Sequence, residues 1–170
     1  MIVGCKLLQE DGTSLNGKFR YQHNEWQEVP GNGAYVAITA ELVAGGQGPV
    51  LAYFECEDPT EAEAPDGVVC FRRVRWIEPA PDRISPELRG QIVRHAPGLS
   101  PDQRYDLALR STPEWQGRCA RHAPEFSPDQ RYKLALKSTP QWQSECAYLA
   151  PGLSPDQRTK LLQIVLAQNP

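Results

Sequence analysis

Five arginine and glutamine side chains recur at matched positions in the C-terminal half of this chain. Arg104, Arg131 and Arg158 follow one another at intervals of 27 residues, and Gln116 and Gln143 are separated by the same interval. A planar guanidinium binds a carboxylate or phosphate through two parallel hydrogen bonds, and a side-chain amide both donates and accepts. We therefore predict that these five residues line one exposed face and contact another molecule.

The partner we expect on this face is another protein with an acidic surface. Residues 82–170 carry 12 basic and 9 acidic side chains, whereas residues 1–81 carry 6 basic and 12 acidic ones. The two halves could therefore attract one another or different partners. A nucleic-acid-binding repeat protein is an alternative, but a balance of +3 is weak for it. Aromatic groups for base stacking are also scarce there, because Tyr105 and Tyr132 are expected to face the core.

A second group of residues suited to chemistry lies near the N-terminus. Tyr21, His23, Trp26 and Tyr35 could line a small-ligand or enzymatic pocket, which is a further alternative. The glycine-rich runs at 31–33 and 45–48 do not lead into a helix with a phosphate-binding pattern, so we interpret them as turns. The chain is predicted to have no enzymatic activity, no cofactor and no metal site.

The five cysteines are odd in number and never form a CxxC pair, which favours neither a disulfide framework nor a zinc site. Cys119 and Cys146 each follow a tryptophan by four residues, so we expect them to be core thiols. No apolar run reaches the roughly 20 residues of a membrane span, and the N-terminus does not resemble a secretory leader. These features predict a cytoplasmic protein without a membrane partner.

An internal repeat determines the elements that position these residues. Copies of 27 residues begin at Ser100, Ser127 and Ser154, a half copy begins at Ser85, and 18 of 27 positions agree between the first two full copies. Each full copy consists of two segments, and every segment, including the half copy, begins with Ser or Thr followed by Pro. This pair favours a helix start, because the hydroxyl accepts from a free amide and proline has no amide to leave unpaired. The pattern predicts six short helices, starting near residues 86, 101, 113, 128, 140 and 155.

Helices of about ten residues are marginal alone, so their stability must come from packing against one another. Trp115 and Cys119, like Trp142 and Cys146, are four residues apart and share a helix face. We expect these residues to form a continuous apolar spine through a short α-solenoid.

Residues 1–80 have the pattern of a small antiparallel β-rich domain, with strands expected over 2–8, 17–22, 33–39, 49–57 and 68–78. The last two should form a hairpin in which Glu55 and Glu57 face Arg73 and Arg75, joined by an acidic, solvated loop. The predicted fold class is therefore α+β. A β-rich domain over 1–80 caps an α-helical repeat domain over 81–170.

Two family resemblances accompany these patterns. Residues from about 84 to 170 resemble the leucine-rich repeat variant family of HEAT-like α-helical repeats. The resemblance is carried by the repeated pattern "LSPDQRYxLALxSTPxWQxxCAxxAP" and by the final residues "LAQNP". The period is longer than that family's usual unit, and Ala-Pro stands where Asn-Pro is expected. The resemblance implies a right-handed α-solenoid that binds something, and it transfers no catalytic residue.

The first 80 residues resemble a small uncharacterised domain of phage and bacterial hypothetical proteins. The matching features are a tryptophan before a glycine-rich turn, an aromatic strand, and a hairpin ending in alternating Arg and Val. This resemblance implies a phage or mobile-element origin and no activity. The whole sequence thus predicts a non-enzymatic protein–protein interaction module built on helical repeats.

Overall fold

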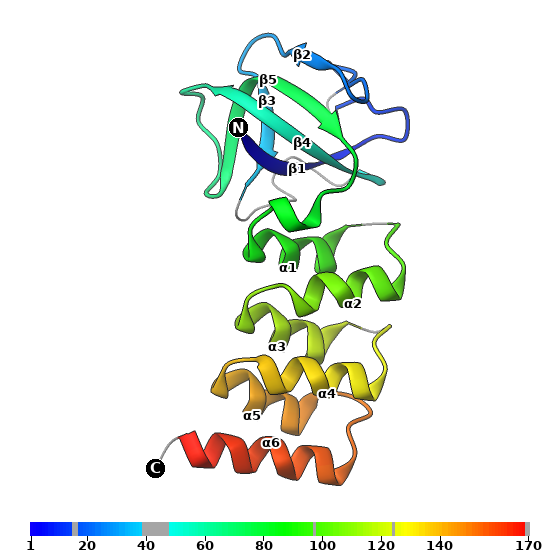
Figure 1. Cartoon of the computed structure of the whole chain (residues 1–170), viewed down its shortest axis with the longest axis vertical. Coiled ribbons are helices and arrows are strands. Elements are labelled where there is room, and N and C mark those ends of the chain that lie inside the picture. Colours follow the sequence, from blue (N-terminus) through cyan, green and yellow to red (C-terminus); the bar gives the residue numbers. More distant parts are fainter. Residues whose placement is uncertain (15–16, 39–47, 97, 124, 169–170) are drawn as a thin grey trace. The chain divides into compact units, whose positions relative to one another are not determined.

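The chain is α+β, as predicted, and divides into two compact units. The computed structural model describes residues 1–14, 17–38, 48–96, 98–123 and 125–168 (Figure 1). The first unit, Met1–Leu99, holds the strands and helix α1, and the second, Ser100–Pro170, holds helices α2 to α6. The sequence predicted a domain boundary at residue 80. In the structure the boundary between the two units follows Leu99, so α1 belongs to the unit that contains the strands.

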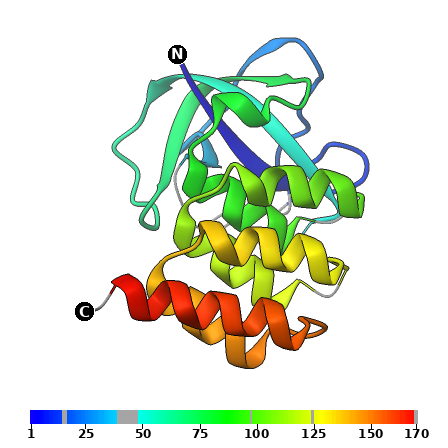
Figure 2. The same cartoon turned by 60° about the horizontal axis from the view of Figure 1, so that its bottom comes forward.

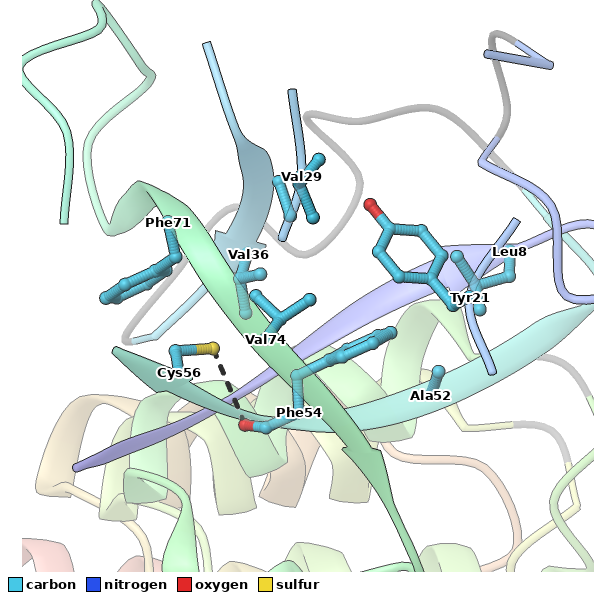
Figure 3. Packing of buried hydrophobic residues seen from close by; sticks show 10 residues of the cluster. Leu8, Tyr21, Val29, Val36, Ala52, Phe54, Cys56, Phe71 and Val74 are labelled. Atoms are coloured by element: carbon cyan, nitrogen blue, oxygen red, sulfur yellow. Dashed lines mark hydrogen bonds between the residues drawn. The ribbon is translucent and has the colours of Figure 1, made fainter. Parts of the chain in front are cut away.

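The strands of the first unit form one antiparallel sheet. They are β1 (Ile2–Leu8), β2 (Trp26–Glu28), β3 (Ala34–Ala37), β4 (Val50–Pro59) and β5 (Val68–Ile77). Their order is β2-β5-β3-β1-β4, and an additional pairing of β4 with β5 closes four of the strands on themselves. The closed sheet encloses a core of apolar side chains. Figure 3 shows nine of them with labels: Leu8, Tyr21, Val29, Val36, Ala52, Phe54, Cys56, Phe71 and Val74.

The β4–β5 hairpin has the expected register. Glu55 lies opposite Arg75 and Glu57 lies opposite Arg73. Arg73 Nη1 is 2.8 Å from Glu57 Oε2, and Arg75 forms an ion pair with Glu55. These contacts confirm the cross-strand charge pairs that the alternating sequence predicted.

The strand expected over 17–22 is not formed, and the edge strand β2 lies a few residues later. Among the described residues, the segment over 17–22 makes only one isolated antiparallel bridge, between Thr13 and Arg20, and the side chain of Gln27 adds two hydrogen bonds to it. Its Oε1 accepts from the Gln22 amide at 2.6 Å, and its Nε2 donates to the Arg20 carbonyl at 3.4 Å. The segment thus folds back on β2, which pairs with β5 over Trp26–Glu28.

A short 3-10 turn, η1 (Pro81–Arg83), leads into α1 (Pro86–His95), and both are attached to the sheet. Arg83 Nη1 is 2.7 Å from Glu55 Oε1. The Ser85 hydroxyl accepts from the Leu88 amide at 3.1 Å and donates to the Ile38 carbonyl at 3.2 Å. The residue that caps α1 therefore also ties the helix start to the segment after β3.

The second unit contains the remaining predicted helices. They are α2 (Pro101–Leu109), α3 (Pro113–His122), α4 (Pro128–Lys137), α5 (Pro140–Leu149) and α6 (Pro155–Gln168). Together with α1, each starts at the proline that the sequence indicated, so the six predicted helices are confirmed. The preceding Ser or Thr hydroxyl accepts from the amide three residues on in α1 to α5, and Ser100 and Ser127 complete capping boxes with Gln103 and Gln130.

These helices pack in two layers (Figures 1 and 2). Helices α2, α4 and α6 lie side by side in one layer, and α3 and α5 lie side by side in the other. Gly117 permits the close approach of α3 and α5, because a Cβ there would lie 2.3 Å from the Cβ of Trp142. The buried Cys146 thiol donates to the Gly117 carbonyl at the same contact, with Sγ 3.6 Å from the oxygen. No helix among the described residues has the length and apolar character needed to cross a membrane.

Candidate protein-binding face

The recurring arginines and glutamines do not form the exposed face that the sequence predicted. Arg131 and Gln143 are each 4% exposed, and Gln116 is 6% exposed. Arg104 and Arg158 are half-buried. The predicted exposure is therefore wrong for the three buried residues, and the reason lies in what their side chains bind.

Arg131, at the start of α4, binds the carbonyl groups at the end of α3. Its Nη1 donates to the Ala120 carbonyl at 2.9 Å, its Nε donates to the Phe126 carbonyl at 3.0 Å, and its Nη2 donates to the Ala123 carbonyl. The last carbonyls of a helix have no partner within the helix, and a guanidinium offers five N–H donors in a fixed fork. Arg131 therefore closes the end of α3 and joins it to α4.

The matched residue Arg158 does the same for the next helix pair. It lies at the start of α6 and donates to the carbonyls of Ala147, Ala150 and Leu153, which follow Ala120, Ala123 and Phe126 by one repeat. Arg104, at the first of the three positions, has its Nε 3.1 Å from Glu125 Oε1. The matched positions of Arg131 and Arg158 are thus explained within the chain.

The two glutamines close the turns between paired helices. Gln116 Nε2 donates to the carbonyls of Leu109 and Ser111 at 2.9 and 3.2 Å. Gln143 Nε2 donates to the matched carbonyls, those of Leu136 and Ser138, at 3.2 Å each. Side chains committed to buried backbone groups in this way are not available to a partner.

The four residues of the predicted N-terminal pocket lie in different surroundings. Tyr21 lies in the core of the sheet, with its ring edge-to-face against Phe54 at a centroid distance of 4.9 Å (Figure 3). His23 lies at the surface, where its ring packs against Trp76 and its Nε2 is 3.6 Å from Glu78 Oε1.

The other two residues of that group have different surroundings again. Trp26 lies under two guanidinium groups, those of Arg73 and Arg75, at 4.7 and 5.1 Å from the ring centroid. Tyr35 is half-buried on β3 beside the core residue Val36, and neighbouring residues of a strand point to opposite faces. The four side chains thus make their contacts with different neighbours, and the shared pocket stays a prediction.

All five cysteines are free and buried, as expected for core thiols. Burial raises the pKa of Cys146 to about 11 and that of Cys56 to about 12, so both remain protonated at neutral pH. A protonated thiol is a poor nucleophile and a poor metal ligand. In the described ranges, moreover, no three His, Cys, Asp or Glu side chains are grouped in a way that could hold a metal ion.

Aromatic and arginine side chains with exposed area gather on α3 and α5 instead. The indoles of Trp115 and Trp142, which the sequence assigned to the apolar spine, are half-buried at matched positions. The Arg118 guanidinium lies between them, 5.0 Å from the centroid of one ring and 5.8 Å from that of the other. Its Nη2 is also 2.5 Å from Glu114 Oε1, which holds the guanidinium in place.

Helix α5 extends this surface with two exposed side chains. Tyr148 is 68% exposed and Leu149 is 55% exposed. Leu149 follows Trp142 by seven residues and so lies on the same side of the helix. We call Trp115, Arg118, Trp142, Tyr148 and Leu149 the indole face.

The sequence signal for this face lies in the positions where the repeat copies differ. At the positions of Tyr148 and Leu149, the preceding copy has Arg121 and His122. In that copy Arg121 forms an ion pair with Glu145 of α5. Replacing two polar residues by Tyr and Leu in the copy that begins at Ser127 leaves apolar area exposed on α5. The residues that recur between copies give no sign of this face.

Comparison of the chain with protein-family models, with curated proteins and with solved structures returns no match. The resemblances to the leucine-rich repeat variant family and to the phage-associated domain therefore stay predictions from the sequence.

Proposed function

We propose that this chain is a non-enzymatic protein–protein interaction module and that its indole face binds the partner. The observations that carry the proposal are the exposed side chains of Tyr148 and Leu149 on α5 and the two half-buried indoles, one on α3 and one on α5, that enclose Arg118. Trp, Tyr and Arg are the residue types that most often dominate binding energy at protein interfaces. A guanidinium held between two rings also has less side-chain freedom to lose on binding.

The same geometry favours this function over the alternatives. The nucleic-acid alternative rested on an exposed arginine stripe, and Arg131 instead uses its donors on backbone carbonyls inside the helical unit. The enzymatic alternative rested on convergence of Tyr21, His23, Trp26 and Tyr35, which lie in separate surroundings. Free, buried thiols fit a reducing compartment, so we place the protein in the cytoplasm as part of this proposal.

A comparison of two baits tests the proposal. Wild-type protein and the double variant Tyr148→Asp/Leu149→Asp are used to capture proteins from lysate, with Gln163→Asp on an exposed position of α6 as the matched control. Any protein held by the wild type and the control but not by the double variant is identified, purified and titrated against all three. We expect the double variant to bind at least tenfold more weakly, because two charges would enter the apolar part of the interface.

Equal affinity of the double variant and the wild type would refute the assignment of the face. The salt dependence of the same titration separates the partner classes. A phosphate backbone gives a steep, linear loss of log affinity with log salt concentration, whereas an interface centred on apolar and aromatic groups changes little.

A further inference from the structure

A pair of lysines on α4 departs from the repeat in a way that costs stability. Asp106 of α2 and Arg110, the residue that follows this helix, form an ion pair one helical turn apart, with Oδ1 and Nη2 separated by 2.9 Å. The matched residues of α4 are Lys133 and Lys137. Like charges four residues apart destabilise a helix, so α4 has lost a favourable pair and gained an unfavourable one.

These lysines have no counter-ion within the part of the chain that the structure describes. Asp129 precedes Lys133 by one turn, but its Oδ1 accepts from Gln157 Nε2 at 3.2 Å. Lys160, on the neighbouring helix α6, repeats the position of Lys133 and is likewise exposed. Leu136 lies between the α4 lysines in sequence and is 38% exposed. We call Lys133, Leu136, Lys137 and Lys160 the lysine face.

The first unit carries a surface of opposite charge in the loop between β4 and β5. The exposed carboxylates of this acidic tip belong to Asp58, Glu61, Glu63 and Asp66, and the structure shows no basic partner for them among the described residues. The unit as a whole has 9 basic and 14 acidic residues, whereas the second unit has 9 basic and 7 acidic ones. The charges of the two units are therefore complementary.

Hydrogen bonds fix the backbone that presents these carboxylates. The Thr60 amide donates to the Cys70 carbonyl at 2.8 Å, and the Thr60 hydroxyl donates to the Asn32 carbonyl at 3.2 Å. At the other end of the loop, the Val68 amide donates to the Pro65 carbonyl at 3.0 Å. An anchored loop loses less conformational freedom on binding than a free one.

We propose that the lysine face of one copy binds the acidic tip of a second copy of this chain. The carboxylates would supply the counter-ions that α4 lacks and relieve the repulsion between Lys133 and Lys137. Such a contact joins two different surfaces, so it is heterologous and can continue from copy to copy. It is held mainly by exposed charges, so it is sensitive to salt.

Sedimentation velocity of the full chain over a range of concentrations tests this proposal. In buffer of about 20 mM salt we expect the average sedimentation coefficient to rise with protein concentration. In about 500 mM salt the Debye length is only a few ångströms, and the coefficient should then stay at the monomer value. A monomer at every concentration in low salt would overturn the proposal.

Charge exchange provides the specific control. Lys133→Glu/Lys137→Glu gives the lysine face more negative than positive groups, and Glu61→Lys/Glu63→Lys gives the acidic tip as many positive as negative groups, so each variant keeps only one of the two surfaces intact. Each double variant alone should associate at least tenfold more weakly than the wild type, and an equimolar mixture of the two should associate again. Self-association that survives in either variant alone, or a mixture that stays monomeric, would refute the pairing.

The indole-face variant Tyr148→Asp/Leu149→Asp separates this inference from the proposed function. It should self-associate like the wild type, because neither residue belongs to the lysine face or the acidic tip. Loss of self-association in this variant alone would assign the contact to the indole face and overturn the proposal.

Discussion

Replacement of Arg131 by alanine tests whether the recurring arginines hold the helical unit together from inside. In the structure this side chain is 4% exposed and donates to three carbonyls near the end of α3. Burial lowers the pKa of the guanidinium, but the group remains charged at neutral pH. Its removal therefore takes a charged donor away from several buried acceptors at once.

The expected loss follows from these contacts. A hydrogen bond from a charged group contributes about 1.5–3 kcal/mol, but such terms are not additive, and water can reach some carbonyls once the side chain is truncated. We expect Arg131→Ala to lower the free energy of unfolding by about 3 kcal/mol. Arg158→Ala removes matched bonds at a half-buried position and should cost about half as much.

Urea unfolding followed by circular dichroism at the helical band measures these differences. Lys133→Ala, at an exposed position of the same helix, is the matched control and should change stability by less than about 0.5 kcal/mol. Arg131→Lys keeps the charge but not the planar fork, so an intermediate loss is expected. If Arg131→Ala costs no more than Lys133→Ala, Arg131 is a surface residue and our account of the repeat is wrong.

Three further predictions concern other contacts. Gly117→Ala should lower the free energy of unfolding by about 2 kcal/mol or more in the same assay, because its Cβ would overlap Trp142 and α3 and α5 would have to move apart; an unchanged midpoint would contradict the packing. The hydrogen bonds from Arg75 hold the pKa of Glu55 below its ordinary value of 4.5. The ionised Glu55 carboxylate therefore stabilises the folded protein above that pH, and this stabilisation is lost as the pH falls through the lower pKa of the folded state. The stability difference between the wild type and Glu55→Gln should therefore shrink between about pH 6 and about pH 3, and a difference independent of pH would count against the ion pair. Thiol titration at about pH 8 should label Cys146 in urea but not in the native protein, because burial raises its pKa to about 11; equal rates in both states would contradict its burial.

The helices could be predicted from sequence because their signals are local. Ser or Thr before Pro at six positions marks each helix start, and the hydroxyl, the proline and the following turn all lie within four residues. The β4–β5 hairpin could be predicted for a similar reason, since alternation in two adjacent strands determines which charges face each other. The strand expected over 17–22 failed because strand pairing is non-local, and Gln27 supplied hydrogen bonds that no periodicity shows.

The site could not be predicted in the same way. Spacing shows that Arg131 and Arg158 have equivalent positions, but it does not show whether an arginine points outward or back onto the carbonyls of the preceding helix. The identical residues of the repeat include those that build its interior, such as Gln116 and Cys119. Residues that differ between copies, such as Lys133 and Tyr148, carry the surfaces proposed to bind partners.

Hydroxyl-radical footprinting of the partner complex tests the central claim that the indole face is the binding surface. Side-chain oxidation rates are measured by mass spectrometry in the free and bound states. We predict that the rates at Trp115, Trp142, Tyr148 and Leu149 fall on binding, while that of Leu166, 72% exposed on α6, stays unchanged. Protection of Leu166 with undiminished oxidation of the four indole-face residues would contradict the account.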